Sequence, residues 1–142
     1  MGAIPPGFAP LESTSPFHEL VGPLHVRRGP EGVAIGLRVD DKHQNRRGVV
    51  HGGMICTLAD FAMGYAASGV TGVPRQLVTT SLACDFAANA RPGDWIEARV
   101  EVFRPGNRVA FVSGYVWRVD PNGAAERIAR VSATFQILQP HA

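Results

Sequence analysis

The feature that most constrains this chain is a nearly uninterrupted apolar segment over residues 52–67 that holds a single carboxylate, Asp60. The segment opens with a glycine pair, Gly52 and Gly53. As a helix it would be about 24 Å long, which is short of a bilayer, so it predicts a helix buried inside protein. A helix that is apolar on all sides must be covered on all sides. We therefore expect a sheet that curls around this helix, a second subunit that covers the rest of it, or both.

Asp60 is flanked in sequence by Leu58, Ala59, Phe61 and Ala62. Burying a lone carboxylate is costly, so such a group is either paired or employed in chemistry. Two interpretations follow. In the first, which we favour, Asp60 is a catalytic carboxylate, and in the second it is a structural aspartate that caps a neighbouring loop.

The bulk composition excludes several classes of protein. A chain of 142 residues is the size of one domain, so we expect a single domain over residues 1–142. Its formal net charge is only +2, with no basic run that would indicate nucleic-acid binding. Cys56 and Cys84 form no CxxC motif, which argues against a zinc site or a redox pair and favours reduced thiols. We expect a cytoplasmic protein without metal, membrane segment or redox cofactor.

Hydrophobic periodicity and turn residues predict a short helix over 15–22 and an irregular segment over 1–13. Strands are expected over 24–28, 33–39, 76–86, 94–103, 108–119 and 126–138. Residues 40–50 are polar and are predicted to be irregular, and residues 105–107 are predicted to form a turn. The run 94–103 alternates cleanly, which places Glu97, Arg99 and Glu101 on a polar face. The expected fold is α+β, with about six antiparallel strands and one long buried helix.

The spacing of Asn45, His51, Gly52, Gly53 and Asp60 resembles the signature of hotdog-fold acyl-CoA thioesterases of the PaaI type, named for phenylacetate metabolism. The likeness extends over most of the chain. It implies a curved antiparallel sheet wrapped around one long helix, assembled into homodimers and often into dimers of dimers. This expectation agrees with the burial argument made above from the apolar segment alone.

The resemblance also implies roles for the signature residues. The Gly52 N–H, at the positive end of the helix, would polarise a thioester carbonyl, although a glycine needed only for packing is the alternative. Asn45 would orient the carbonyl or a water molecule, or else form an Asx turn. Asp60 would act as general base or as nucleophile, and the Thr79 hydroxyl would position the water. We expect His51 mainly to brace the loop.

Coenzyme A carries phosphates, so its binding site needs arginines or backbone N–H groups. The resemblance points to the segments 86–91 and 104–108. Asn89 stands where many relatives have proline, and Pro105 is an addition, so the sequence does not assign a particular arginine to a particular phosphate. The predicted substrate contacts are Gly53, Phe86, Asn89, Arg91, Arg104, Gly106, Asn107 and Arg108.

Helix geometry adds one constraint. Gly52 and Asp60 are eight residues apart on the same helix, so about 12 Å apart along its axis, too far to act on one thioester carbon. If two helices run antiparallel across a two-fold axis, Gly52 of one subunit meets Asp60 of the other. We therefore predict composite sites in a homodimer.

The favoured function is hydrolysis of an aromatic or medium-chain acyl-CoA to the free acid and CoA, with no cofactor beyond the CoA of the substrate. Two alternatives stay open at this point. One is a non-catalytic acyl-CoA binding or sensor module on the same fold, and the other is an enoyl-CoA hydratase or dehydratase. Thioesters of carrier proteins are also open as substrates.

Overall fold

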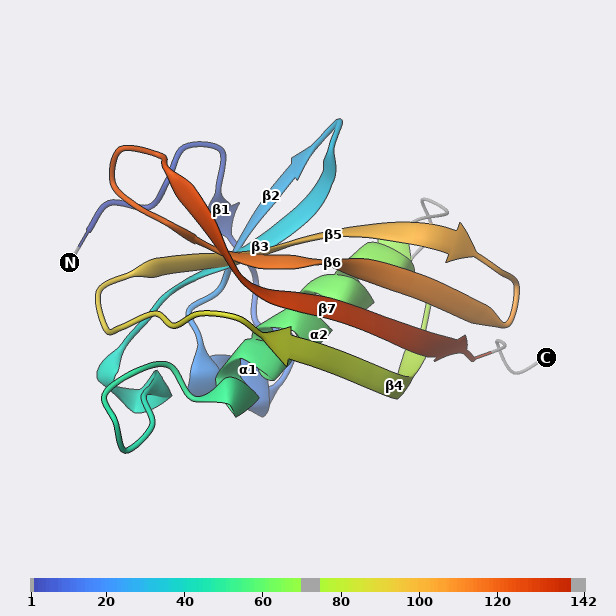
Figure 1. Ribbon diagram of the computed structural model, residues 1–142. Helices are drawn as coiled ribbons and strands as arrows, with labels where there is room; N and C mark the ends of the chain where they lie inside the picture. The colour runs from blue at the N-terminus through green and yellow to red at the C-terminus, as the bar shows by residue number, and fades with distance from the viewer. Residues whose placement is uncertain (1, 70–74, 139–142) are drawn as a thin grey trace.

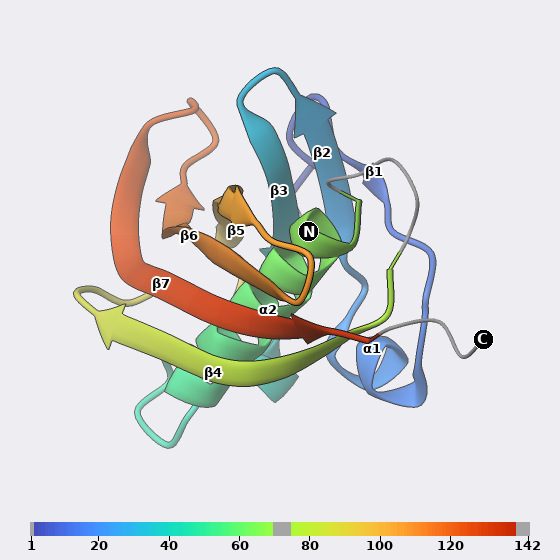
Figure 2. The same cartoon turned by 90° about the vertical axis from the view of Figure 1, so that its right-hand side faces the viewer.

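The computed structural model describes residues 2–69 and 75–138 and shows one antiparallel sheet wrapped around one long helix, α2 (Gly52–Gly69) (Figure 1). The seven strands follow the order β1-β2-β3-β5-β6-β7-β4. Turned by 90°, the sheet is an arc that surrounds much of α2 (Figure 2). The other elements are β1 (Ala9–Pro10), α1 (Pro16–Val21), β2 (His25–Gly29), β3 (Gly32–Arg38), η1 (Asp41–His43), β4 (Leu77–Phe86), β5 (Trp95–Pro105), β6 (Val109–Val119) and β7 (Ala125–Ile137).

The core lies between α2 and the concave face of the sheet. Leu58, Ala59, Ala62 and Met63 on α2 are fully buried against strands on either side of the arc. The strands contribute alternate apolar residues to the same core, among them Ile35, Leu37, Ile96, Ala98, Val112, Val116 and Val131. The curled sheet expected from the apolar segment is therefore confirmed.

The sheet leaves one stripe of α2 uncovered. The stripe runs along Gly53, Cys56, Asp60 and Gly64, which are half-buried or exposed, as are Thr57 and Phe61 beside it. The residues that face the core are Met54, Ile55, Leu58, Ala59, Ala62 and Met63. Three of the four residues in the stripe are small, so the surface of the helix is flat here. Asp60 thus lies on a side of α2 that residues 2–69 and 75–138 do not bury.

The predicted elements between residues 15 and 138 are confirmed to within a few residues. Ser15 caps α1 as its pattern predicts, since its hydroxyl accepts a hydrogen bond from the His18 N–H. Two details differ. Residues 41–43 form the short 3-10 helix η1 inside the loop that was expected to be irregular, and β5 continues to Pro105. Proline is tolerated there because β3 pairs with β5 only as far as Val100, so the missing N–H interrupts no ladder.

The N-terminal segment is not wholly irregular, which corrects the sequence-based expectation. Ala9 and Pro10 form β1 and pair with β2, and the Leu11 N–H donates to the Leu24 carbonyl at 2.9 Å. β1 supplies the seventh strand. The pair is only two residues long, and its apolar and proline-rich neighbours carry no strand periodicity, so nothing in the sequence distinguishes it from a loop.

Glu97 is the second correction. Its alternation places it on the polar face with Arg99 and Glu101, as predicted, but that face is covered here and only 1% of the residue is exposed. The Trp95 indole N–H donates to Glu97 Oε1 at 3.1 Å, and Arg27 and Arg99 each donate to Oε2 at 2.9 Å. The N-terminal segment covers this face, since the Phe8 ring lies edge-on to Trp95 with 5.0 Å between centroids. The alternation was read correctly, but the cover comes from a distant part of the chain.

We predict that Glu97→Ala destabilises the fold by about 2 kcal/mol, because the buried Trp95 indole N–H loses its acceptor and two guanidinium groups lose their partner. The measurement is urea unfolding followed by tryptophan fluorescence. Glu126→Ala is the matched control, since Glu126 pairs with Arg118 where both side chains are about half exposed, and little change is expected. Equal destabilisation by the two substitutions would contradict this account.

Candidate active site

His51 organises the start of α2. Its Nδ1 accepts the Gly53 N–H at 2.8 Å, and its carbonyl accepts the N–H groups of Met54 and Ile55 at 2.8 and 3.3 Å. Of the four N–H groups that begin a helix, only that of Gly52 has no hydrogen-bond partner among the described residues. The helix end therefore presents a single free donor, carrying the partial positive charge of the helix dipole.

The expected bracing role of His51 is observed, and it explains the second glycine of the pair. A Cβ on Gly53 would lie 2.9 Å from His51 Nδ1, which is too close for the cap to form. Because His51 already accepts the Gly53 N–H, that group is not free for the substrate contact predicted for it. The free N–H of Gly52 has an aromatic neighbour, since a Cβ at Gly52 would lie 3.4 Å from the Phe86 ring.

Asp60 lies beside a cavity of about 360 Å³ rather than in an internal ion pair. Its Oδ1 accepts the Thr79 hydroxyl at 2.8 Å. No arginine, lysine or histidine in residues 2–69 and 75–138 forms an ion pair with it. The cavity is lined by Leu11, Thr14, His18, Asp60, Phe61, Gly64, Tyr65, Ser68, Arg75, Leu77, Thr79 and Phe135.

A bulge in β4 aims the Thr79 hydroxyl at Asp60. Thr79 pairs with Phe135 of β7 and Ser81 with Thr134, so Thr80 is an extra residue in the ladder. Thr79 therefore shares the helix side of the sheet with Phe135, which is buried against α2. The neighbouring Thr80 hydroxyl instead bonds to the carbonyl and hydroxyl of Thr134, at 3.0 and 2.9 Å.

The two cysteines are neighbours across α2 and β4. Burial raises the pKa of Cys84 to about 12, and a hydrogen bond with Cys56 and the nearby charges of Asp85 and Asp60 act in the same direction. At neutral pH the Cys84 thiol is therefore protonated and a poor nucleophile. This argues against Cys84 as a nucleophile, and neither Cys56 nor Cys84 forms a disulfide.

Asn45 forms the Asx turn that was the alternative to a site role. Its Oδ1 accepts the N–H groups of Arg47 and Val49 at 2.8 and 3.3 Å, which fixes the loop before α2. Its amide nitrogen has no partner among the described residues and can still donate. The two interpretations of Asn45 are thus compatible, since each uses a different atom of the amide.

The two segments predicted to bind CoA lie at opposite ends of α2 (Figure 1). Residues 86–91 lie near the start of the helix, where the Val50 N–H donates to the Ala90 carbonyl at 2.9 Å. Residues 104–108 form the β5–β6 hairpin at the other end. The exposed side chains in these segments include Phe86, Asn89, Arg91, Arg104, Asn107 and Arg108, while Gly106 is half-buried in the turn. One chain therefore does not bring the two segments together.

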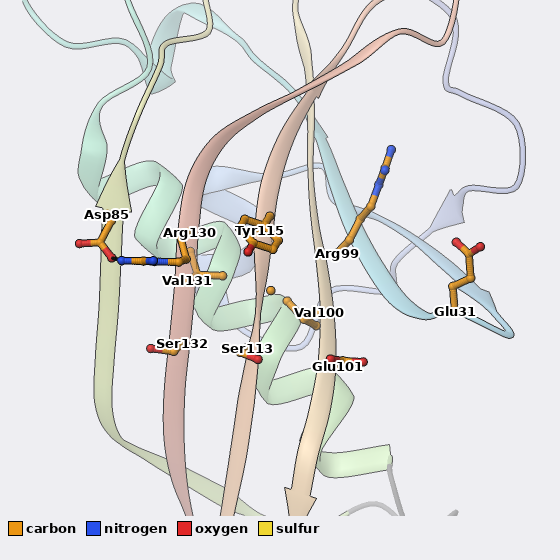
Figure 3. Close-up of a pocket in the computed structure, with 11 residues that line it drawn as sticks. Glu31, Asp85, Arg99, Val100, Glu101, Ser113, Tyr115, Arg130, Val131 and Ser132 are labelled. Atoms are coloured by element: carbon orange, nitrogen blue, oxygen red, sulfur yellow. Dashed lines mark hydrogen bonds and ion pairs between the residues drawn. The ribbon is translucent and has the colours of Figure 1, made fainter.

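A second hollow, of about 460 Å³, lies on the outer face of the sheet (Figure 3). Arg130 and Asp85 face each other across β7 and β4 with 3.0 Å between Nη2 and Oδ2, and both side chains are mostly exposed. None of the catalytic or substrate-binding residues predicted from the sequence lines this hollow. It lies across the sheet from Asp60 and is separate from the candidate site.

The described part of the chain holds no cluster of three histidine, cysteine or acidic side chains that could bind a metal ion. Likewise, none of its helices has the length and apolar character needed to cross a membrane. The sequence reasoning missed four polar residues of the Asp60 cavity, namely Thr14, His18, Ser68 and Arg75. Thr14 and His18 come from α1 and the segment before it, and no local signal indicates that this segment packs beside α2.

The sequence is similar to those of known thioesterases and esterases. The sequence profile of the thioesterase superfamily matches residues 47–125. A Pseudomonas aeruginosa protein named as an esterase is 41% identical over 111 residues, which covers 78% of this chain and 83% of that protein. The mouse protein acyl-coenzyme A thioesterase 13 is 27% identical over 92 residues, covering 62% of each chain.

Solved structures give the same result. The phenylacetic acid degradation protein PaaI from Thermus thermophilus, solved as a single-residue mutant, has a TM-score of 0.72 and 27% identity over 87% of this chain and 100% of that one. The sequence match extends over more than half of the chain, and the structural match includes both the curved sheet and the long helix. The chain therefore belongs to the thioesterase superfamily, as a hotdog-fold thioester hydrolase of the PaaI type.

Proposed function

We propose that this enzyme hydrolyses aromatic or medium-chain acyl-CoA thioesters to the free acid and CoA, at composite sites formed by two subunits. One observation carries the proposal. A single helix holds one unpartnered N–H, at Gly52, and one carboxylate beside a cavity, Asp60. These are the electrophilic and basic groups that thioester hydrolysis needs. CoA enters as part of the substrate, and the proposed reaction needs no further cofactor.

The Gly52 N–H and the Asp60 carboxylate of one helix are about 12 Å apart along its axis. They therefore cannot act on the same thioester, and each needs a complementary group from elsewhere. Two features favour a second copy as the missing half. The stripe of α2 that the sheet leaves uncovered is flat and contains Asp60. Beside it, β4 is an edge strand with eight of its ten positions exposed, including Val78, Leu82 and Phe86. A long apolar edge strand of this kind is a ready surface for pairing with another chain.

In the proposed dimer, two α2 helices lie antiparallel with their uncovered stripes in contact. Gly52 of one subunit then faces Asp60 of the other. The same two-fold axis brings residues 86–91 of one subunit to the end of the site where residues 104–108 of its partner lie. Both segments predicted to bind CoA would then reach one substrate, which they do not within a single chain.

The chemistry follows from these positions. The Gly52 N–H stabilises the negative charge that develops on the thioester oxygen, an effect worth about 3 kcal/mol for one preorganised donor. The Thr79 hydroxyl holds Oδ1 of Asp60, which leaves Oδ2 to accept a proton from water or to attack the carbonyl carbon. Asn45 would donate through its amide nitrogen to the carbonyl or to the water. Apolar side chains, including Leu11, Phe61 and Phe135, would hold the acyl group.

We predict that Asp60→Asn lowers kcat for acyl-CoA hydrolysis by about a hundredfold or more, because the amide can neither take a proton from water nor attack the carbonyl. A thiol-trapping dye reports the release of CoA from a panel of aromatic and medium-chain substrates. Circular dichroism and binding of the uncleaved substrate check that the variant folds. Turnover near that of the parent would overturn the role of Asp60, and absence of turnover by the parent on any acyl-CoA would overturn the function.

We predict that Thr79→Val lowers kcat by about tenfold, since a hydrogen bond to a charged carboxylate is lost where the carboxylate must be held in place. Thr80→Val is the matched control, because the adjacent hydroxyl bonds to Thr134 and not to Asp60. The two variants are compared by steady-state kinetics on the same substrate. Similar losses in both would show that β4 as a whole, and not the Thr79 hydroxyl, is responsible.

The register of the proposed dimer makes a prediction about Cys56. Residue 56 is midway between residues 52 and 60, so it falls on the two-fold axis opposite its own copy. Helices packed 8–10 Å apart bring such Cα atoms to roughly 4–5 Å, which is within the range of a disulfide. Oxidation by dioxygen with copper–phenanthroline should therefore join two subunits through Cys56.

The test compares two single-cysteine variants on a non-reducing gel. Cys84→Ser, which keeps Cys56, should give a covalent dimer, and Cys56→Ser, which keeps Cys84, should not. Light scattering establishes that both variants are dimers before oxidation. A dimer that cross-links only through Cys84, or not at all, would show that the helices do not meet in this register.

A further inference from the structure

Arg75 is a half-buried residue whose guanidinium has two buried nitrogen atoms without a partner among the described residues. Four buried side-chain polar atoms in the described residues have no hydrogen bond, and two of them, Nε and Nη2, belong to Arg75. The other two belong to His25 and Arg38, and the Arg38 guanidinium has backbone carbonyls as partners elsewhere. Buried N–H groups left without an acceptor are costly, so Nε and Nη2 favour an acceptor that is not among the described residues.

The backbone of Arg75 is fixed close to α2. The Ser68 hydroxyl donates to the Arg75 carbonyl at 2.9 Å and accepts the Arg75 N–H at 3.1 Å. Ser68 and Asp60 are two helical turns apart, about 12 Å along the axis. The Arg75 side chain lines the same cavity as Asp60, and no ion pair joins the two. The cavity thus carries a carboxylate at one position and an unpaired cation at another.

The walls between these two charged groups are mostly apolar. Phe61, Tyr65, Leu77 and Phe135 line the cavity together with Asp60 and Arg75. A chain of methylene groups or a ring suits this part of the cavity, while its far end offers two N–H donors and a positive charge. A carboxylate satisfies both the donors and the charge, whereas a hydroxyl group can accept from the donors but leaves the charge unpaired.

We propose that the preferred acyl group carries a second carboxylate at the end distant from the thioester, and that Arg75 binds it. This inference rests on the proposed function and names its substrate class, the CoA monothioesters of medium-length dicarboxylic acids. Arg75 is then a specificity-determining residue. Hydrolysis would release a free dicarboxylic acid and CoA.

The test uses pairs of substrates that differ only in the terminal group. Adipoyl-CoA is compared with hexanoyl-CoA, and suberoyl-CoA with octanoyl-CoA, by kcat/KM for thiol release. The parent enzyme should prefer the dicarboxylic member of each pair by about tenfold to a hundredfold, the value of a hydrogen bond to a charged group. Arg75→Gln should abolish this preference, so that kcat/KM for the two members of each pair becomes nearly equal. Arg75→Lys should restore part of it.

Arg130→Gln is the matched control, because Arg130 pairs with Asp85 on the outer face of the sheet. This variant should prefer the dicarboxylic substrates as strongly as the parent does. A preference for the monocarboxylic member, or one that survives Arg75→Gln, would overturn the proposal. A better rate with 4-hydroxyphenylacetyl-CoA than with any dicarboxylic thioester would also overturn it. In each of these results hydrolysis persists, so the proposed function would stand.

Equilibrium binding separates the two proposals further. Calorimetry measures binding without turnover, so it can use the Asp60→Asn variant. This variant should bind adipoyl-CoA more tightly than hexanoyl-CoA. The difference in affinity should vanish in the double variant that also carries Arg75→Gln. If no acyl-CoA is hydrolysed by the parent but this difference is observed, the proposed function fails and the carboxylate site is retained. If the two ligands bind equally, the carboxylate site is overturned.

Discussion

The stripe of α2 that the sheet cannot reach determines most of what is particular to this molecule. A sheet that curls around a helix closes only part of its circumference, and here the gap coincides with Gly53, Cys56, Asp60 and Gly64. A carboxylate is acceptable at such a position because it is neither in the core nor fully in water. Its neighbours Leu58, Ala59 and Ala62 could not have been charged, since the sheet buries them completely.

The start of the helix shows how few residues are needed to build a donor for an oxyanion. His51 satisfies three of the first four N–H groups through one ring nitrogen and one carbonyl. What stays free is one N–H, at a position where glycine leaves room for a ligand beside the Phe86 ring. The His-Gly-Gly motif therefore has a physical meaning in this chain: the histidine caps, the second glycine permits the cap, and the first glycine presents the remaining donor.

Much of this arrangement could be predicted from the sequence, because its signals are local. The apolar run around Asp60, the turns between alternating strands and the cap at Ser15 each lie within a short window of residues. Three features depend on contacts between distant residues and could not be predicted. Glu97 is buried because residues near Phe8 cover it, β1 exists only because β2 pairs with it, and Arg75 enters the cavity because Ser68 fixes its backbone. The distance between residues 86–91 and 104–108, the two segments proposed to bind CoA, could not be predicted either, because it depends on the order of the strands in the sheet and not on separation along the sequence.

The extra residue in β4 has a consequence for how related chains are compared. Thr79 and Thr80 are adjacent and chemically identical, and like any neighbours in a strand they point to opposite sides of the sheet; the shift of register at the bulge decides that Thr79 is the one that faces the helix. A related strand without the insertion would need its hydroxyl one position later in the chain to reach the same carboxylate. A serine or threonine that seems displaced by one place in an alignment can therefore serve the same carboxylate in space, and the apparent loss of this side chain in a relative is no sign of lost activity.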